Sequence, residues 1–384
     1  MGVVTATLSI VTLAELRTPA VLVEQSRAER NLDRMQAAAD ARGLRLRPHA
    51  KTHKSVTFAR LQVGRGAVGI CCAKLGEAEI FADAGIENIR LPYPLNPVNA
   101  DRVVALLDRT HLSFIVDHAD VARGWSRAME AARRTVDVLV KVDVGLHRCG
   151  IDPEAANAAA FIAAIAKLPG LRFRGLLSHA GHGYGGTSEA EIEGVAATEA
   201  RLLRTLAERC AGDGIPIEEI SVGATPTARF SLQQEGLTEL RPGNYVYCDR
   251  TQVGLGAATW SDCALTVLAR VVTRPAADRI VLDCGSKTLT NDPARGFGPT
   301  PGYGVVLQAI DAAVPDESLL IERLSEEHAV VKVLNGATPL EPGDLVRVVP
   351  NHSCVVSNLM DTVWVVDGAT VVDQLEVSAR GAVT

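Results

Sequence analysis

Apolar and polar positions alternate along the first 250 residues in a repeating pattern of strand and helix. Short apolar or β-branched runs lie near residues 21–23, 44–47, 68–72, 89–91, 112–116, 138–142, 173–177 and 217–222. Alanine-rich stretches with helical spacing separate them, at 27–42, 75–84, 119–133, 153–168 and 189–212. Strands that alternate with helices pair in parallel, and eight such units are enough to close a barrel. The pattern therefore predicts a (β/α)8 TIM-like barrel, with a doubly wound open sheet as the alternative.

The open sheet lacks its usual phosphate-binding fingerprint, because the nearest match, at 254–259, has no final glycine and follows no clear strand. After about residue 255 the helical pattern fades, and runs rich in β-branched residues are separated by Gly, Pro, Asn and Asp. This texture is typical of an antiparallel β domain. We expect the barrel over residues 20–252, the β domain over 1–19 and 253–384, and a long loop at 291–303.

Composition narrows the class of protein. The 384 residues are 47% hydrophobic, so a sizeable core can form, and the net charge of −6 argues against a general nucleic-acid binder. No run approaches the about eighteen apolar residues of a membrane span, and the first twenty residues lack the pattern of a secretory signal. We therefore expect no membrane partner, a cytoplasmic location, and reduced thiols at the eight cysteines.

Chemically active side chains follow the predicted strands at the points where those strands end. His49 and Lys51 follow the second strand in RPHAKTHK, and Arg148 follows the sixth in VKVDVGLHRCG. His179 closes the seventh strand in LLSHAGHGYGG, with His182 just beyond it. In a barrel these strand ends converge on one cavity, where active sites are built.

Two glycine-containing segments at the same rim have the composition of a phosphate site. One follows the eighth strand at a predicted helix start, and the other lies in RPGNYVY. Their residues are Gly223, Ala224, Thr225, Gly243, Asn244 and Tyr245. Backbone N–H groups and hydroxyls at a helix start suit a phosphate dianion.

Each feature also has a simpler interpretation. A lysine after a strand is usually a solvated loop charge, a buried histidine is usually a satisfied core residue, and Gly-Ala-Thr-Pro is usually a turn. Their coincidence on one predicted rim favours catalysis, because a lysine facing a phosphate cradle indicates a Schiff base with pyridoxal phosphate (PLP). Charge repulsion from Arg47, His49 and Lys54, with partial burial, would favour the reactive deprotonated form of Lys51.

A possible metal pair lies near the end of the chain, where PNHSCVVSN places His352 and Cys354 two positions apart. On a strand, residues with this spacing point to the same face. Imidazole and thiolate form a borderline-soft pair that suits zinc and accepts manganese, with magnesium as a third option. Two protein ligands leave coordination positions open, as a catalytic metal requires.

Taken together, the motifs resemble those of the D-threonine aldolase and D-serine dehydratase family, PLP enzymes of fold type III with an alanine-racemase-like barrel. RPHAKTHK, GICCAKLGEAEI, RCG, LRPGNY, EEH and NHSC carry the resemblance, which covers nearly the whole chain. It implies that Lys51 is the Schiff-base lysine, that Arg148 contacts the phenolic oxygen of PLP and that His179 lies against its ring. It also implies that both glycine segments bind the phosphate and that His352 and Cys354 bind a divalent ion.

The resemblance implies a lyase that acts on β-hydroxy-D-amino acids. Family aldolases carry His-x-Asp and dehydratases His-x-Cys, so Cys354 favours a dehydratase. His182 favours an aldolase, because it aligns with a histidine that takes the β-hydroxyl proton. We expect D-threonine aldolase activity, which releases glycine and an aldehyde. The alternative is a D-serine or D-threo-3-hydroxyaspartate dehydratase, in which Lys51 removes the Cα proton and a 2-oxo acid and ammonia form.

Two further classes stay open. A non-catalytic PLP carrier shares the barrel and the lysine but lacks a C-terminal β domain. An amino-acid racemase needs a second base, commonly a tyrosine from the β domain, and Tyr303 is the only tyrosine after residue 255. The resemblance also implies a homodimer in which each β domain closes the barrel of the partner subunit.

Overall fold

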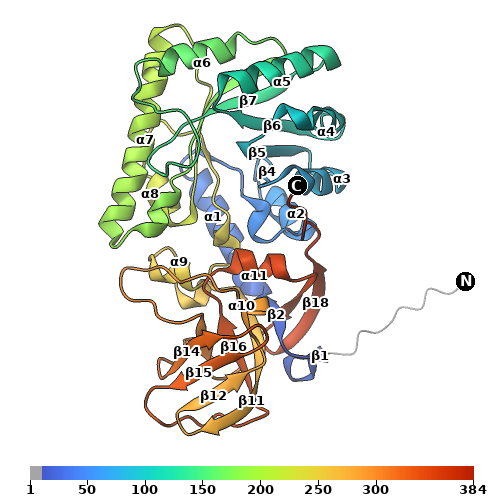
Figure 1. Cartoon of the computed structure of the whole chain (residues 1–384), viewed down its shortest axis with the longest axis vertical. Coiled ribbons are helices and arrows are strands. Elements are labelled where there is room, and N and C mark those ends of the chain that lie inside the picture. Colours follow the sequence, from blue (N-terminus) through green and yellow to red (C-terminus); the bar gives the residue numbers. More distant parts are fainter. Residues whose placement is uncertain (1–10) are drawn as a thin grey trace, which may run out of the picture. The chain divides into compact units, whose positions relative to one another are not determined.

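The computed structural model describes residues 11–384, which form two compact units (Figure 1). One unit holds the described residues up to 31 together with 246–254 and 258–380, and the other holds 32–245, 255–257 and 381–384. Expectations that fall on residues 1–10, namely the start of the β domain and the missing signal sequence, lie outside the described residues.

The unit around residues 32–245 is built on an eight-stranded parallel sheet in the order β3-β10-β9-β8-β7-β6-β5-β4. Its strands are β3 (Arg45–Leu46), β4 (Ile70–Cys71), β5 (Asn88–Pro94), β6 (His111–Val116), β7 (Val136–Lys141), β8 (Leu171–Leu177), β9 (Glu219–Val222) and β10 (Glu239–Leu240). The two edges meet, because Cys71 N donates to Pro48 O at 2.7 Å and His49 forms a parallel bridge with Cys71. The sheet therefore closes into the predicted barrel.

Helices alternate with these strands and flank the sheet (Figure 1). They are α1 (Gln25–Asp40), α2 (Val56–Gly64), α3 (Leu75–Asp83), α4 (Ala100–Leu106), α5 (Ala119–Ala132), α6 (Ala158–Ala166), α7 (Glu189–Gly212) and α8 (Thr225–Ser231). Helix α6 is shorter than the predicted 153–168. Arg209 donates to the carbonyls of Pro153 and Ala155, both at 2.9 Å, so a side chain binds two backbone oxygens in the turn that precedes α6.

One predicted barrel strand is wrong. The run at 21–23 is β2 (Ala20–Glu24), which pairs with β11 and β17 of the other sheet. Its expected place in the barrel is taken by β10, which pairs with β3 and β9. A two-residue strand is too short to show an apolar run in the sequence. The barrel boundary expected at residue 20 thus differs from the division that the structure shows after Asn31, within α1.

The other unit is a ten-stranded, mainly antiparallel sheet. Its strands are β1 (Val11–Thr12), β2, β11 (Leu265–Ala276), β12 (Arg279–Leu282), β13 (Val305–Leu307), β14 (Leu319–Leu324), β15 (Ala329–Val333), β16 (Leu345–Val349), β17 (Thr362–Asp367) and β18 (Thr370–Glu376). Its helices are α9 (Arg250–Gly254), α10 (Ser286–Leu289) and α11 (Ser353–Leu359). The mainly antiparallel β domain is thus confirmed, and residues 291–303 form the expected loop between α10 and β13.

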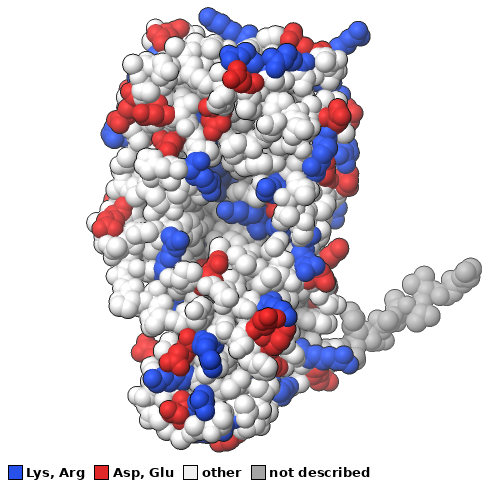
Figure 2. All heavy atoms as spheres, viewed as in Figure 1, with Lys and Arg blue, Asp and Glu red and all other residues white. Residues whose placement is uncertain are grey.

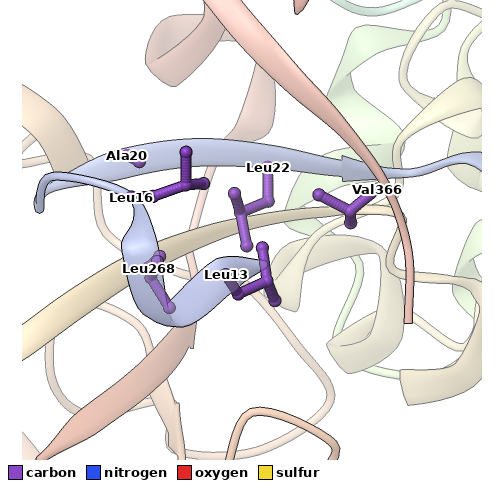
Figure 3. Packing of buried hydrophobic residues seen from close by; sticks show 6 residues of the cluster. All are labelled: Leu13, Leu16, Ala20, Leu22, Leu268 and Val366. Carbon is purple, nitrogen blue, oxygen red and sulfur yellow. The ribbon is translucent and has the colours of Figure 1, made fainter. Parts of the chain in front are cut away.

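Burial explains why β2 joins this sheet. Leu13 and Leu16, which precede the strand, pack with Leu22 of β2, Leu268 of β11 and Val366 of β17 in one buried cluster (Figure 3). The hydrophobic effect of closing this cluster holds the N-terminal segment against two strands that lie far along the sequence.

The molecular surface carries interspersed acidic and basic side chains on the face seen in Figure 2. The eight cysteines carry free thiols. Across residues 11–384, no helix has the length and apolar character needed to cross a membrane.

Candidate active site

Lys51 lies in the short turn η2 (Ala50–Thr52) that follows β3 in the barrel unit. The ring of His49 caps this turn, because its Nδ1 accepts a hydrogen bond from Lys51 N at 3.3 Å. Burial, followed by the positive charges of Lys51 and Arg241, holds the pKa of His49 well below 6.5. The imidazole is therefore neutral at pH 7, and the side chain of Lys51 is exposed beyond it.

Arg47 and Lys54 do not form the repelling basic cluster that the sequence predicts around Lys51. Arg47 Nε lies 2.8 Å from Glu239 Oε2, and Lys54 Nζ lies 3.1 Å from Glu77 Oε1. All four side chains are buried. Each cation is compensated by its own carboxylate, so the prediction that these two charges act on Lys51 is wrong.

The two glycine segments pack against one another and against the turn of Lys51. A Cβ atom on Gly223 would lie 2.8 Å from the carbonyl carbon of Arg241, so the two backbones approach closely. A Cβ atom on Gly243 would lie 3.2 Å from Cβ of His49. The structure thus brings together segments that are separated by about twenty residues of sequence, as a phosphate site would require.

Thr225 supplies the observation that tests whether these segments fit a phosphate. Its Oγ1 is buried and has no hydrogen-bond partner within residues 11–384. Thr225 begins α8, directly after Gly223 and Ala224, which are also buried. A buried hydroxyl without a partner is costly unless a ligand uses it, and a phosphate oxygen is a suitable acceptor. The segment therefore fits the phosphate group of PLP.

Asn244 and Tyr245 are buried at the start of η5 (Asn244–Val246). The phenol oxygen of Tyr245 accepts a hydrogen bond from Gln62 Nε2 at 3.1 Å. Burial raises the pKa of this phenol, so Tyr245 stays protonated at pH 7. Gln62 also contacts the ring of His53 at 3.2 Å, which links Tyr245 to the turn of Lys51.

His179 contacts the candidate phosphate-binding segment at residues 223–225 and lies near Lys51. Its Nδ1 donates to the carbonyl oxygen of Gly223 at 2.6 Å, because a carbonyl can only accept. Burial, followed by the charges of Lys141 and Lys51, lowers the pKa of His179 well below its usual value. The ring of His179 is thus neutral at pH 7 and is held beside Gly223, near Lys51.

Sequence reasoning assigned no individual role to two buried basic residues at this rim. Lys141, the last residue of β7, is 3% exposed, and its Nζ has no partner in the described part of the chain. Burial, followed by the charge of Arg241, lowers its pKa to about 7. Arg241 donates from Nε to Ser221 Oγ at 2.7 Å. The exposed Arg148 also contributes to the lowered pKa of Lys141 and hence lies at the same rim.

The sequence feature that could have identified Lys141 is a charged residue at the end of an otherwise apolar strand, in VKVDVGLHRCG. Arg241 is the first residue of RPGNYVY, a segment that the sequence reasoning singled out without giving this arginine a role of its own. Neither position differs in sequence from a solvated loop charge, so only the burial of the two side chains identifies them.

His182 lies in η4 (Gly181–Gly185), on the loop after β8. A Cβ atom on Gly145 would lie 3.2 Å from its Nε2, so the ring packs on the loop after β7. Its Nδ1 is buried and makes no hydrogen bond to any described residue. Burial lowers the pKa of His182, with Asp143 acting in the opposite direction. A neutral imidazole with an unpaired nitrogen can accept a proton.

The metal candidates His352 and Cys354 do not lie on a strand, which corrects the prediction. His352 is the residue before α11 (Ser353–Leu359), and Cys354 lies in the first turn of that helix. Asp249 Oδ2 accepts a hydrogen bond from Ser353 N at 2.9 Å and so caps the helix start. The two side chains nonetheless meet in a hydrogen bond.

Asp292, which the sequence reasoning missed, orients the ring of His352. Nδ1 of His352 lies 2.6 Å from Asp292 Oδ2, and a donated Nδ1–H leaves the Nε2 lone pair for a metal. Burial alone would lower the pKa of His352, but the bond to Cys354 and the negative charges of Cys354 and Asp249 raise it to about 10. The negative groups around the ring favour a cation, so a divalent ion would fit here if it displaced the Nε2 proton.

The described residues contain no group of three or more His, Cys, Asp or Glu side chains placed to hold a metal ion. An ion bound by His352 and Cys354 would therefore keep open positions for water or substrate.

The chain matches two known protein families along most of its length. Residues 23–251 match the family described as "Alanine racemase, N-terminal domain", and residues 264–366 match the "Putative serine dehydratase domain". The chain is 35% identical to D-threonine aldolase of Arthrobacter sp over 379 residues, which span 96% of this chain and 94% of that protein. This chain belongs to the D-threonine aldolase and D-serine dehydratase family.

The chain is also similar to other proteins of the D-threonine aldolase and D-serine dehydratase family over most of its length. D-threo-3-hydroxyaspartate dehydratase of Delftia sp. (strain HT23) is 32% identical over 355 residues, 89% of this chain and 92% of that protein. The crystal structure of D-threonine aldolase from Filomicrobium marinum has a TM-score of 0.87 at 30% identity and covers 98% of both chains. The alanine-racemase-like fold is confirmed, and the chain is a lyase of this PLP-dependent family.

Proposed function

We propose that this chain is a PLP- and divalent-metal-dependent D-threonine aldolase, which cleaves β-hydroxy-D-amino acids between Cα and Cβ into glycine and an aldehyde. His182 is the reason to propose an aldolase before a dehydratase, because a retro-aldol cleavage needs a base for the β-hydroxyl proton. The buried, unpaired Nδ1 of this neutral ring provides such a base on the barrel unit.

The barrel residues would bind PLP. Lys51 would attach to its aldehyde carbon, and the segments 223–225 and 243–245 would hold its phosphate. Arg148 would contact its phenolic oxygen, while the neutral rings of His49 and His179 would line the site without adding charge. When bound, PLP draws electrons from the bonds at the substrate Cα.

The antiparallel unit would bind one divalent ion, manganese or zinc, with magnesium as a third option. His352 and Cys354 would be its protein ligands, and Asp292 would hold the His352 ring through Nδ1. When bound, the ion supplies Lewis acidity to the β-hydroxyl. His182 would take the hydroxyl proton.

A dehydratase is the second candidate, and Cys354 favours it. The thiolate partner of His352 is the ligand expected of the dehydratase branch, and D-threo-3-hydroxyaspartate dehydratase is among the relatives. In this reaction Lys51 would remove the Cα proton of D-serine or D-threo-3-hydroxyaspartate, and His182 would have no role.

A non-catalytic PLP carrier or a racemase is less well supported. A carrier would have no use for the antiparallel unit with His352 and Cys354, and Tyr303 is the only tyrosine after residue 255 that could serve a racemase as the second base. We further propose that the protein acts in the cytoplasm as a homodimer.

One assay tests the proposal. The purified protein is loaded with PLP and incubated with D-threonine or D-serine, with and without added Mn²⁺ or Zn²⁺. Glycine and acetaldehyde from D-threonine are expected, in a metal-dependent manner, with L-threonine as the stereochemical control. A 2-oxo acid without glycine would replace the aldolase by the dehydratase, and a protein that attaches no PLP would overturn both.

A further inference from the structure

Lys54 ends the turn that carries Lys51 and has an unusual backbone. Its φ is +48°, in the left-handed region that glycine adopts readily and other residues rarely enter. Its N–H donates to Ala50 O at 2.7 Å, which closes the turn around Lys51. Glycine would satisfy this backbone, so the presence of a lysine points to a use for its side chain.

That side chain reaches a buried carboxylate. Lys54 Nζ lies 3.1 Å from Glu77 Oε1, and the two side chains are 7% and 1% exposed. The other oxygen of Glu77 accepts a hydrogen bond from Ala73 N at 2.5 Å. Lys54 thereby ties the turn of Lys51 to the segment between β4 and α3.

Such a pair is a poor means of gaining stability. Removing two charges from water costs free energy that their attraction barely repays, and two neutral side chains would serve as well. A buried charged pair does restrict the geometry of the groups that it joins, because any displacement leaves a charge without its partner. In this turn the restricted geometry is that of the backbone from which Lys51 projects.

We propose that Lys54, acting through Glu77, is a positioning residue that aims the amine of Lys51 at the aldehyde carbon of PLP. This inference rests on the proposed function, in which Lys51 holds the cofactor. Attack of an amine on a carbonyl depends on orientation, and small misplacements of a reacting group cost large factors in rate. Lys54 of RPHAKTHK would thus serve the exposed Lys51 through backbone geometry and not through its charge.

Three variants separate positioning from simple folding. Lys54→Arg keeps the charge and the ion pair. Lys54→Met leaves Glu77 without its partner. The double variant Lys54→Met/Glu77→Gln is neutral and keeps an acceptor for Ala73 N, so it is expected to fold even where the single change does not. Glu79→Gln on the same helix is the matched control, because it breaks the pair between Glu79 and Arg102, at 2.7 Å, without touching the turn.

The rate of PLP attachment to Lys51 is measured in cofactor-free protein from the visible absorbance of the lysine-bound cofactor. The double variant should attach PLP on the order of 10- to 100-fold more slowly than the wild type. Lys54→Arg and Glu79→Gln should stay within about 3-fold of the wild type. Pyridoxal, which lacks the phosphate, should show the same ratios, because the effect lies at the amine and not at the phosphate site.

A second readout is independent of PLP chemistry at the site. Reductive methylation of Lys51 with formaldehyde, compared with that of the exposed Lys167 by mass spectrometry, reports whether the amine is still accessible. A positioning role predicts unchanged methylation and unchanged circular dichroism beside slow PLP attachment. A double variant that attaches PLP as fast as the wild type overturns this inference alone. A wild type that attaches no PLP overturns the proposed function and this inference with it.

Discussion

Asp292 and His352 are 60 residues apart in the sequence, yet Asp292 Oδ2 lies 2.6 Å from Nδ1 of His352. Asp292 stands in the long loop at 291–303, which the sequence showed only as a connection. Asn351 Nδ2 donates to the backbone oxygens of Asp292 and Gly302 at 3.0 and 2.9 Å, so both ends of the loop are fixed beside α11. The loop therefore belongs to the candidate metal site.

Asp292→Asn should weaken binding of the divalent ion by roughly 10- to 100-fold, the usual effect of removing the carboxylate that orients a metal-binding histidine. The amide can still accept from Nδ1–H, but its charge is gone. Affinity is measured by competition with a coloured zinc chelator. PLP attachment should not change, and Asp311→Asn, an exposed aspartate of the same unit, serves as the control. Equal affinity in variant and wild type would exclude the role given to Asp292.

Thr225→Val should weaken cofactor binding without lowering the stability of the cofactor-free protein. Valine has nearly the same shape and removes a buried hydroxyl that has no partner among residues 11–384, so the cofactor-free protein should not lose stability. PLP affinity should fall about 10-fold or more, because a hydrogen bond to a charged group contributes about 1.5–3 kcal/mol. Thermal denaturation and PLP titration measure the two effects.

Thr227→Val is the matched control on the same helix. The hydroxyl of Thr227 donates to Ala224 O at 3.3 Å, so its loss should lower stability and change PLP affinity little. A Thr225→Val protein that binds PLP as tightly as the wild type would contradict the phosphate assignment.

The barrel and the β domain were predictable because their apolar periods are long and distinct. Helix α7 coincides with the predicted 189–212, and the strands after residue 255 form the mainly antiparallel sheet that the change of texture predicted. The error at β2 shows the limit of this signal. An apolar run predicts a buried strand but not its sheet, and β2 joins the antiparallel sheet through contacts with strands more than 240 residues away.

Sequence reasoning could place candidate site residues at strand ends but could not find the partners of the charged residues beside them. Lys51, His49 and His179 follow strands, so barrel geometry alone brings them together. The carboxylate partners of Arg47 and Lys54 lie on β10 and α3, and the pairing of charges across a fold leaves no local pattern.

Lys141→Met should change how stability depends on pH. The pKa of Lys141 is about 7 in the fold and 10.5 for an ordinary lysine, so between these values the unfolded chain binds a proton that the folded chain does not. Stability therefore rises with pH in this window, by at most about 1.4 kcal/mol per pH unit. The variant lacks this contribution, so it should be more stable than the wild type at pH 7, and its advantage should shrink by pH 9. Urea denaturation of cofactor-free protein at both pH values measures the difference, and an advantage that stays constant would contradict the assignment.

His182→Ala should separate the two candidate reactions. General-base catalysis is typically worth about 10²–10⁴ in rate, so an aldolase should lose that much D-threonine cleavage while KM changes less. The base must be unprotonated, and burial lowers the pKa of His182 below 6.5. The kcat/KM of the wild type should therefore fall only as the pH drops through a value below 6.5, and this acid limb should vanish in the variant. His147→Ala is the control, since this exposed rim histidine is already bonded to Asp143 at 3.0 Å. Unchanged D-threonine cleavage in His182→Ala would remove the reason to place the aldolase before the dehydratase, in which Lys51 alone moves the proton.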